Sequence, residues 1–442
     1  MSFKYRAQKI AEGHWVLEAG CPVPVHAFLS DELYRDSEEN VWAQMVTAAN
    51  LPGVKRVAVT PDMHVGYSVP IGVVIETEGT LLPTAAGYDI GCGMVQLRTD
   101  VDAGAAQDPA RRRAWIEAVT ERIGVGVGAK PARRQRRLAA ATVAEVLRHG
   151  APALGRRDDR AERGGIPVED DVNVPERAAA KTGQLGSLGG GNHFCEMQVG
   201  DDGRVWVMIH TGSRGFGWTI ADDFFREGAD ALSLKKGERD LVWFARDSEL
   251  GRRYWALHNM AANFAIANRV LIADAVKEAL DEVYGGTTEL FYEISHNLIQ
   301  CEGRAGTFVH RKGATRAFPA GHASLRNTRW EETGHPILIP GSMATGSAIL
   351  FAQPGAEAAC WSVNHGAGRR LARGEARRRL HQTEVDRAMK EADILINTRN
   401  APVDESAACY KDLDQVLAAV EQADLARVVH RLRPVACIKG AD

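Results

Sequence analysis

Gly87-Tyr88-Asp89-Ile90-Gly91-Cys92-Gly93-Met94 places a carboxylate and a thiol three residues apart within a run of glycines. Glycine adopts backbone conformations that other residues rarely reach, so a turn of this kind can aim both side chains at one point. Carboxylates and thiolates are metal ligands, and a pair on one loop is half of a metal site. One pair cannot hold an ion, so further ligands must come from elsewhere in the chain. Taken alone, the stretch is more simply interpreted as a buried Cys in an ordinary glycine turn.

The composition is that of an ordinary globular protein. The chain has 442 residues, of which 45% are hydrophobic and 25% charged, and its formal net charge is -3. This balance gives no overall attraction to nucleic acids or membranes. Local arginine clusters are most simply solvated helix faces, but together they leave room for a surface that follows phosphates. The clusters lie at 111–113, 133–137, 156–157 and 369–379.

Cysteine usage and the distribution of apolar residues indicate where the protein resides. The seven cysteines are odd in number and widely spread, with no C-x-x-C pair, which is typical of a reducing compartment. The first 20 residues contain no continuous apolar run, and no stretch reaches the roughly 18 uninterrupted apolar residues of a membrane span. The sequence therefore predicts a cytoplasmic protein without a membrane segment.

Strand-like and helical segments are mixed along the whole chain. Short β-rich runs are expected at 54–60, 71–76, 94–98, 205–209, 289–294, 307–309, 360–363 and 434–438. Helical spacing is found at 31–50, 253–283, 412–421 and 425–432. The Arg-rich region 106–180 is predicted to hold two helices with a polar connection in 106–165 and a loop at 155–174. The pattern indicates an α+β fold with central packed β-sheets surrounded by helices.

Five histidines stand at the ends of predicted strands or at glycine-rich loops. Functional side chains converge at such positions, because loops at a sheet edge bring distant parts of the chain together. Any one of these histidines alone would more simply be a core or capping residue. Several of them, together with the Asp89/Cys92 loop, indicate a site at the strand ends. They are His193, His210, His296, His310 and His365.

Three of these histidines extend the half-site on the glycine loop. Asp89, Cys92, His193, His210 and His296 form a set of oxygen, sulfur and nitrogen ligands. Five ligands exceed one tetrahedral site but suit two adjacent divalent ions that share the thiolate. The ligand types permit Mn, Fe, Co or Zn. Paired metal ions are a recurrent device of phosphoryl transfer, so phosphate chemistry is expected.

Glycine-rich segments at 186–191, 211–215, 340–343 and 366–369 can expose backbone N–H groups to phosphate. None matches G-x-x-x-x-G-K-[ST] or lies in a clear dinucleotide-binding unit. The lysine-centred K-x-D-G motif of ordinary nucleotidyl ligases is absent too. If the chain activates a nucleotide covalently, His365 is the expected nucleophile, since Gly366 exposes it and Arg369 is close enough to hold phosphate.

The combined motifs resemble the RtcB family of RNA-splicing ligases, and they run in family order from about residue 61 to residue 440. The resemblance implies joining of an RNA 2',3'-cyclic phosphate or 3'-phosphate end to a 5'-hydroxyl end, with GTP and two Mn ions as cofactors. It is carried by Gly-Tyr-Asp89-Ile-Gly-Cys92-Gly-Met, Gly-Gly-Gly-Asn192-His193-Phe-Cys-Glu196, His210-Thr-Gly-Ser-Arg-Gly, Ser-His296-Asn, Val-His-Arg311-Lys312-Gly-Ala, Pro340-Gly-Ser-Met and Asn-His365-Gly-Ala-Gly-Arg369.

Roles follow from the same resemblance. Asp89, Cys92 and His193 would hold one Mn ion, and Cys92, His210 and His296 the other. His365 would attack the α-phosphate of GTP and carry GMP, which then passes to the RNA 3'-phosphate before the 5'-hydroxyl attacks. Phosphate or RNA contacts would come from Arg214, Arg311, Lys312 and Arg369. The guanosine pocket would draw on Asn192, Glu196, Pro340, Gly341, Ser342, Met343, Ser347, His365, Gly366, Ala367, Gly368, Tyr410 and Lys439.

The chain also departs from the family pattern. Gly66-Tyr67-Ser68 replaces a common Gly-Lys-Gly, Ala344 replaces a common Gly, and Asn364 a common Ser. The resemblance predicts one domain over 1–442, because the site residues interleave along the chain. It suggests tRNA halves or damaged RNA as substrate and archease as an activating partner. Two alternatives remain open at this point: a two-metal phosphoesterase acting on RNA ends, and a non-catalytic RNA-binding paralogue.

Overall fold

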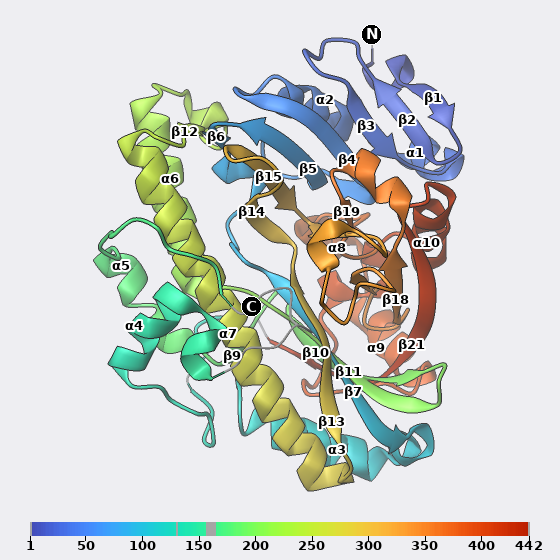
Figure 1. Cartoon of the computed structure of the whole chain (residues 1–442). Coiled ribbons are helices and arrows are strands. Elements are labelled where there is room, and N and C mark those ends of the chain that lie inside the picture. Colours follow the sequence, from blue (N-terminus) through green and yellow to red (C-terminus); the bar gives the residue numbers. More distant parts are fainter. Residues whose placement is uncertain (1, 130, 156–164, 441–442) are drawn as a thin grey trace.

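Two large antiparallel-rich sheets form the centre of the computed structural model, which describes residues 2–129, 131–155 and 165–440 (Figure 1). The first has seven strands in spatial order β1 (Gln8–Ala11), β2 (His14–Leu17), β3 (Val25–Phe28), β4 (Val54–His64), β5 (Ile71–Glu78), β15 (Thr307–Lys312) and β14 (Asn297–Cys301). The second follows the order β13 (Thr288–Ser295), β7 (Gly93–Asp102), β11 (Arg204–Thr211), β10 (Phe194–Gly200), β21 (Ala426–Lys439), β18 (Ser347–Ala352) and β17 (Pro336–Pro340), with β20 (Leu395–Ile396) beside β21.

Three short strand pairs lie outside these sheets. They are β6 (Thr80–Leu81) with β12 (Phe244–Ala245), β8 (Gly124–Val125) with β9 (Ser187–Gly189), and β16 (Ala314–Arg316) with β19 (Ser362–Asn364). The β16–β19 pair carries the chain into His365, which directly follows β19.

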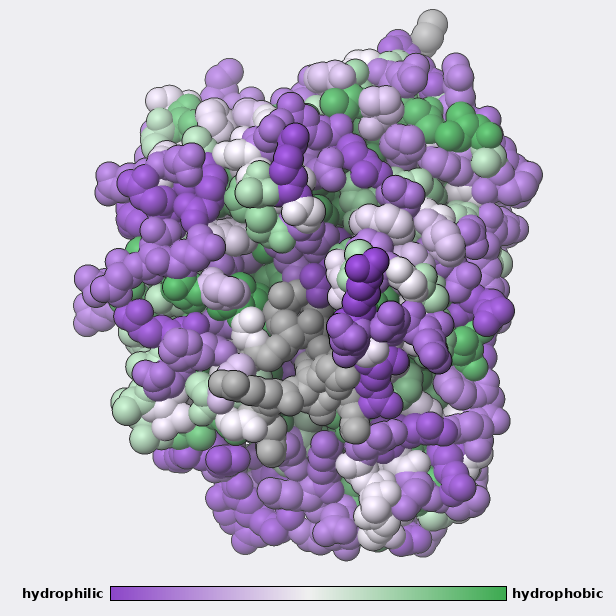
Figure 2. Space-filling view, in the orientation of Figure 1, coloured by the Kyte–Doolittle hydropathy of each residue, from purple (hydrophilic) through white to green (hydrophobic). Residues whose placement is uncertain are grey.

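Helices surround the sheets, as predicted. They are α1 (Asp31–Asp36), α2 (Glu39–Ala49), α3 (Pro109–Thr120), α4 (Ala140–His149), α5 (Glu176–Ala179), α6 (Arg214–Ala231), α7 (Glu249–Tyr284), α8 (Arg373–Arg379), α9 (Gln382–Glu391) and α10 (Leu413–Gln422). None of the helices in the described part of the chain has the length and apolarity that a membrane span needs. The face shown in Figure 2 is mostly hydrophilic, with apolar residues in small separate patches.

Helix α7 connects the two sheets and runs diagonally across Figure 1. The hydroxyl of Ser248 caps its first turn by accepting a hydrogen bond from the N–H of Gly251, and the chain leaves it at Gly285 with φ of 67°. Trp255 near its start packs in one apolar cluster with Phe308 of the first sheet. Val276 near its end packs with residues of the second sheet. Buried apolar area of this kind is the main stabilising contribution, at about 25 cal/mol per Å².

Strand register brings the predicted ligands to one edge of the second sheet. Cys92 directly precedes β7, His193 directly precedes β10, and His296 directly follows β13. His210 lies near the end of β11 opposite Met94. The four strands are antiparallel, so two begin and two end at this edge, and all four ligand positions meet there.

Most sequence predictions of the elements are confirmed, with two differences. The helix expected at 31–50 is interrupted at Ser37, whose backbone is extended. The helix expected at 425–432 is wrong: these residues belong to β21, paired with β10 and β18. The two helices expected within 106–165 are α3 and α4. Of the loop expected at 155–174, residues 165–174 form neither helix nor strand, while 156–164, including the Arg156-Arg157 pair, lie outside the described residues.

Candidate functional site

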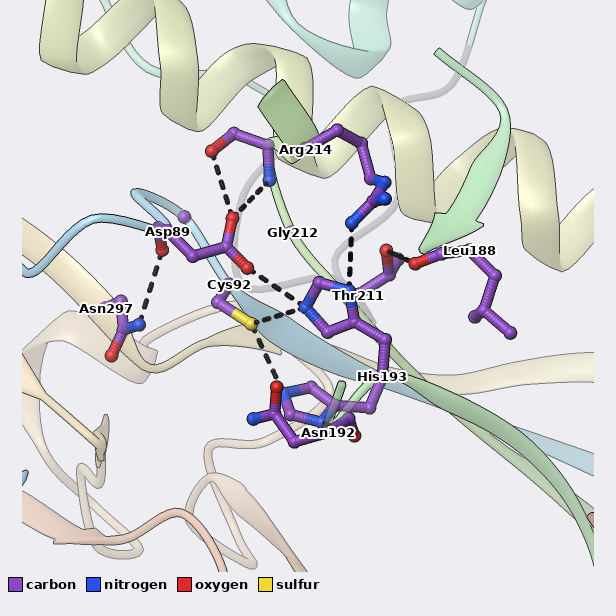
Figure 3. A network of polar contacts seen from close by, with 12 residues as sticks. Asp89, Cys92, Leu188, Asn192, His193, Thr211, Gly212, Arg214 and Asn297 are labelled. Carbon is purple, nitrogen blue, oxygen red and sulfur yellow. Dashed lines mark hydrogen bonds and ion pairs between the residues drawn. The ribbon is translucent and has the colours of Figure 1, made fainter. Parts of the chain in front are cut away.

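The predicted ligand side chains form one continuous buried chain of contacts. The Nε2 atom of His193 lies 3.0 Å from Oδ2 of Asp89 and 3.4 Å from Sγ of Cys92. The Cys92 sulfur lies 3.2 Å from Nε2 of His210, which lies 3.2 Å from Nε2 of His296. Figure 3 shows the Asp89, Cys92 and His193 part of this network converging between α6 and the sheet. The fold therefore brings together all five predicted ligands, although the Asp89/Cys92 loop precedes the first of the histidines by more than 100 positions.

The Asp89 carboxylate is fixed from the opposite side by the start of α6. The backbone N–H and hydroxyl of Ser213 donate to Oδ1 of Asp89 at 3.0 and 3.2 Å. Gly212 lies so close to this carboxylate that a Cβ atom there would be 2.4 Å from Oδ2. Any larger residue would displace Asp89, which explains why glycine occurs at this position.

The protonation states of the predicted ligands favour binding of a cation. Although burial opposes it, the hydrogen bond and charge of His193 together with Arg214 lower the pKa of Asp89 to about 2. Burial and the Asp89 charge raise the pKa of the Cys92 thiol well above its usual range. Burial lowers the pKa values of His210 and His296 well below the usual range, so these imidazoles are neutral and can act as ligands.

The residues fit a metal centre by their chemistry. Ligand atoms of Cys92, His193 and His210 all lie within 4.8 Å of one another and all three residues are buried. Nδ1 of His296 is buried without a hydrogen-bond partner among the described residues. Buried acceptors that face one another are costly unless a proton or a cation lies between them. These residues would hold one or two divalent ions, and an ion would supply the positive charge that this concentration of acceptors lacks.

Arg269 of α7 holds the backbone behind the metal ligands. Its guanidinium is fully buried and donates to the carbonyl oxygen of Gly91 at 2.5 Å, to that of Thr211 at 3.3 Å and to the hydroxyl of Ser295 at 2.8 Å. Each of these residues is the chain neighbour of a predicted ligand. The guanidinium also forms a buried ion pair with the carboxylate of Glu293. One side chain thus positions three ligand-bearing segments, which sequence analysis did not anticipate.

Arg269→Met should lower the free energy of unfolding by about 3–5 kcal/mol, because it leaves the buried Glu293 carboxylate without its partner. Urea unfolding followed by circular dichroism measures this change. The double variant Arg269→Met/Glu293→Met should recover much of the loss. Arg431→Met, which breaks an exposed pair with Asp414, should cost at most about 1 kcal/mol. Equal effects of the two single variants would contradict the positioning role of Arg269.

His365 lies beside the metal ligands and is oriented by a residue that sequence analysis missed. Its ring centroid is 4.7 Å from that of His296. Its Nδ1 lies 2.7 Å from Oδ2 of Asp62, a completely buried carboxylate in β4. The hydroxyl of Thr60 donates to the other oxygen of Asp62 at 2.7 Å. With Nδ1 donating to Asp62, Nε2 of His365 carries the lone pair that a nucleophile needs.

A cavity of about 310 Å³ opens beside His365. It is lined by every residue expected to hold guanosine, together with Arg369. Residues that sequence analysis did not single out also line it: His64, Ile71, Phe194, Arg373, Glu405 and Cys437. The predicted residues that line it are Asn192, Glu196, Pro340, Gly341, Ser342, Met343, Ser347, His365, Gly366, Ala367, Gly368, Tyr410 and Lys439.

Two buried carboxylates give the cavity its polarity. Burial raises the pKa of Glu196 to about 8, against the opposing effects of the Gln198 hydrogen bond and the Lys439 charge. Burial acts in the same direction on Glu405, but Lys439 and Arg373 outweigh it and lower the pKa of Glu405. Nζ of Lys439 donates to Glu405 at 2.7 Å. The cavity therefore offers one carboxyl group that changes protonation near neutral pH and one that stays ionised.

The four basic residues expected to contact phosphate lie in different surroundings from one another. Arg214 donates to Nδ1 of His193 at 3.1 Å, and Arg369 lines the cavity, where it donates to Glu405 at 3.2 Å. Lys312 is buried near the Asp89 loop, and burial lowers its pKa to about 8. Arg311 is buried apart from the cavity.

Arg311 is held by protein groups. Its guanidinium donates to both carboxylate oxygens of Glu302 at 2.7 and 2.9 Å, to Oε1 of Gln300 at 3.0 Å and to the hydroxyl of Ser362 at 2.8 Å. A further bond of 3.2 Å reaches the carbonyl oxygen of Cys360. These bonds use all five N–H groups, so Arg311 supports the strand that leads to His365, and its expected contact with phosphate stays a prediction.

Comparison with known proteins gives one consistent result. A family model described as tRNA-splicing ligase RtcB matches residues 44–440. A tRNA-splicing ligase RtcB of Thermococcus kodakarensis is 32% identical, with 95% of each chain covered. An RNA-splicing ligase RtcB of Mycobacterium tuberculosis is 34% identical over 90% of this chain and 100% of that protein. A tRNA-splicing ligase RtcB of Nanoarchaeum equitans is 33% identical over 98% of this chain and 99% of that protein.

Proposed function

Because this chain belongs to the RtcB family of RNA-splicing ligases, we propose that it is a GTP- and Mn-dependent ligase for broken RNA. It joins a 2',3'-cyclic phosphate or 3'-phosphate end to a 5'-hydroxyl end. One observation carries the proposal: an oriented histidine, His365, lies between a buried metal-ligand cluster and a cavity of nucleotide size. A phosphoesterase would need the metal ligands but neither the histidine nor the cavity.

The metal ligands divide into two overlapping sets in this proposal. Asp89, Cys92 and His193 hold one Mn ion, and Cys92, His210 and His296 hold the other. Bound ions supply positive charge that neutralises the triphosphate of GTP and the charge that develops during transfer. The contacts of 3.0–3.4 Å among these side chains support this division, since the Cys92 sulfur contacts both His193 and His210.

His365 performs the covalent step. Its Nε2 attacks the α-phosphorus of GTP, a P–N bond forms, and pyrophosphate leaves with the electrons of the broken P–O bond. Asp62 holds the Nδ1 proton and stabilises the positive charge that the ring acquires. A 2',3'-cyclic phosphate is first opened by water to the 3'-phosphate. The RNA 3'-phosphate then attacks the phosphorus of the bound GMP, the P–N bond breaks, and the 3' end is activated. Attack by the 5'-hydroxyl forms the phosphodiester and releases GMP.

The cavity residues bind guanosine. A carboxylate accepts hydrogen bonds from the N–H groups of the guanine edge, and Glu196 is the buried carboxyl group placed for this role. Lys439 lies 5.8 Å from the centre of the Phe194 ring and Arg369 lies 5.1 Å from that of Tyr410, so cations and rings alternate along the wall. Such a wall suits a flat aromatic base and its phosphates.

Asp62→Asn should slow covalent labelling by GTP by about 10² to 10⁴-fold, because the ring loses the carboxylate that fixes its tautomer and stabilises its charge. The rate of label transfer from α-labelled GTP at saturating nucleotide measures this, with bound Mn determined in parallel. Asp202→Asn, a change in a turn remote from His365, should label at the wild-type rate. An unchanged rate in Asp62→Asn would remove Asp62 from the mechanism.

GTP affinity should rise about tenfold per pH unit below pH 8 and level off above it. The pKa of Glu196 is raised to about 8, so its carboxyl group is protonated at pH 7 in the empty cavity, whereas the guanine-bound form is ionised. Binding therefore releases a proton, and a higher pH favours binding. Calorimetry in buffers of different ionisation enthalpy should detect the proton. Glu196→Gln should bind GTP weakly and without this pH dependence; a wild type without proton release would contradict the assignment.

The chain acts as one catalytic unit in this proposal, because residues from Asp62 to Lys439 contribute to a single site. Its RNA substrates are tRNA halves or damaged RNA, and archease is the partner that would activate it. Ligation of an RNA pair with 3'-phosphate and 5'-hydroxyl ends, in the presence of GTP and Mn, tests the complete reaction. Absence of both a joined product and a GMP adduct in a metal-loaded protein would overturn the proposal.

A further inference from the structure

A second open cavity lies on the other side of the metal ligands from the nucleotide cavity. It has a volume of about 800 Å³, and Asp89 and Arg214 form its inner end. Arg177, Lys181 and Trp218 are among the residues along its walls. Arg177 also pairs with Asp222 and Asp223 outside the lining, so Lys181 and Arg214 carry the positive charge of the groove. This charge suits a polyanion that approaches the metal centre.

Three aromatic side chains stand in a row beside this groove. The ring centroids of Tyr67 and Tyr88 are 5.8 Å apart, and those of Tyr88 and Trp218 are 5.9 Å apart with an interplanar angle of 23°. Tyr67 is 68% exposed and Trp218 is 48% exposed. Tyr88 is half-buried, with its ring 4.8 Å from that of the core residue Phe225. The central ring, Tyr88, therefore packs on the core, while the two outer rings, Tyr67 and Trp218, are exposed to solvent.

The row is attached to the reaction centre through the chain itself. Tyr88 directly precedes the predicted ligand Asp89. Trp218 lies one helical turn after Arg214 on α6, so both side chains face the same side of the helix. Tyr67 is held on its loop by Gln44, whose amide donates to the carbonyl oxygens of Gly66 and Tyr67 at 2.8 Å each. These rings are positioned by the framework, although two of them are exposed to water.

We propose that Tyr67, Tyr88 and Trp218 form a stacking platform for unpaired nucleobases of the RNA end that enters the groove. The inference rests on the proposed function and adds the part of the substrate that is recognised. Every nucleobase has a flat π-face, so exposed rings bind single strands without a fixed sequence, while cations follow the backbone. A protein partner would fit less well, because the rings border a groove that carries Lys181 and Arg214 and ends at Asp89, and they do not form a broad apolar patch.

The platform predicts that each exposed ring contributes measurably to RNA binding. Loss of one stacking contact should lower affinity for single-stranded RNA about tenfold, within the range measured for base–aromatic stacking. A blunt duplex, whose bases are already stacked on one another, should gain little from the rings.

Fluorescence anisotropy with labelled oligonucleotides tests the platform in the full-length, Mn-loaded protein. Trp218→Ala and Tyr67→Ala should each bind single-stranded RNA about tenfold more weakly, for a strand ending in 3'-phosphate, for one beginning with 5'-hydroxyl, or for both. The end that is affected identifies the strand on the platform. Trp218→Phe should restore most of the affinity, and Tyr5→Ala, a change at a remote residue that is 80% exposed, is the matched control.

An RNA with an abasic site at its terminal nucleotide lacks the base that would stack on the platform. It therefore tests the same contact from the RNA side. The wild type should bind this RNA as weakly as Trp218→Ala binds the intact strand, and Trp218→Ala should lose nothing further. Affinities of both variants within twofold of the wild type for both ends would overturn the platform. Labelling of the wild type with α-labelled GTP separates the two proposals: aromatic-dependent RNA binding without label would refute the ligase and leave the platform standing.

Discussion

His365→Ala should form no covalent GMP adduct at all, whereas the unchanged protein retains label from α-labelled GTP after denaturation. The adduct needs a nucleophilic nitrogen that lies beside the metal ligands and faces the nucleotide cavity. Two other histidines line this cavity: His210 is itself a predicted ligand, and His64 has its Nδ1 at 2.9 Å from the carbonyl oxygen of Asp62. The loss should exceed 10³-fold and be limited only by detection. The adduct of the wild type should be stable in alkali and labile in acid, as expected for a phosphoramidate.

The control for this experiment is a histidine variant that leaves the site intact. His430 lies at the surface, where its Nδ1 is 2.8 Å from a carboxylate oxygen of Asp201. His430→Ala should therefore label as the wild type does. The metal content of His365→Ala should be unchanged, but its thermal stability should fall, because the change leaves the buried Asp62 carboxylate without its partner. Persistent labelling of His365→Ala would require a different nucleophile and would remove the central step of the proposed mechanism.

The site could be predicted from sequence to the extent that its residues lie at recognisable local positions. Cys92, His193 and His296 each stand next to a glycine or at a strand end, and the sequence shows those positions directly. Asp62 lies inside β4 and reaches His365, 303 positions later. Nothing near Asp62 in the chain indicates that contact, because only the paired sheets bring the two residues together. The same applies to Arg269, which occupies an ordinary position in a long helix.

The fold could be predicted where local pattern and tertiary context agree. The 36-residue helix α7 was expected because its composition and spacing favour a helix throughout. Residues 425–432 show the opposite case. Their local pattern was interpreted as helical, but β10 and β18 on either side supply backbone hydrogen bonds to β21, and this pairing outweighs local propensity. Arg311 shows the same limit for charged residues. A basic residue is usually exposed, and only the structure shows the partly buried Glu302 carboxylate that holds this one.

Cys92→Ala should abolish binding of the metal pair and, with it, covalent labelling by GTP. The Cys92 sulfur is the contact that joins the two halves of the ligand set, at 3.4 Å from His193 and 3.2 Å from His210. Without it each ion would keep two protein ligands, which is too few to retain Mn through dialysis. Bound Mn measured by atomic absorption should fall from about two per chain to below about 0.2, with label reduced at least about 10³-fold.

Cys195→Ala is the matched control for this change. Cys195 is an equally buried thiol in the same sheet, but it packs in the apolar core and contacts no predicted ligand. It should retain both ions and label normally. The wild type should also bind Mn more tightly as pH rises, because burial keeps the Cys92 thiol protonated until an ion displaces its proton, and Cys92→Ala should lack that proton release. If Cys92→Ala kept two ions and full labelling, the shared-thiolate arrangement would be wrong, and the histidines with Asp89 would have to hold the metals alone.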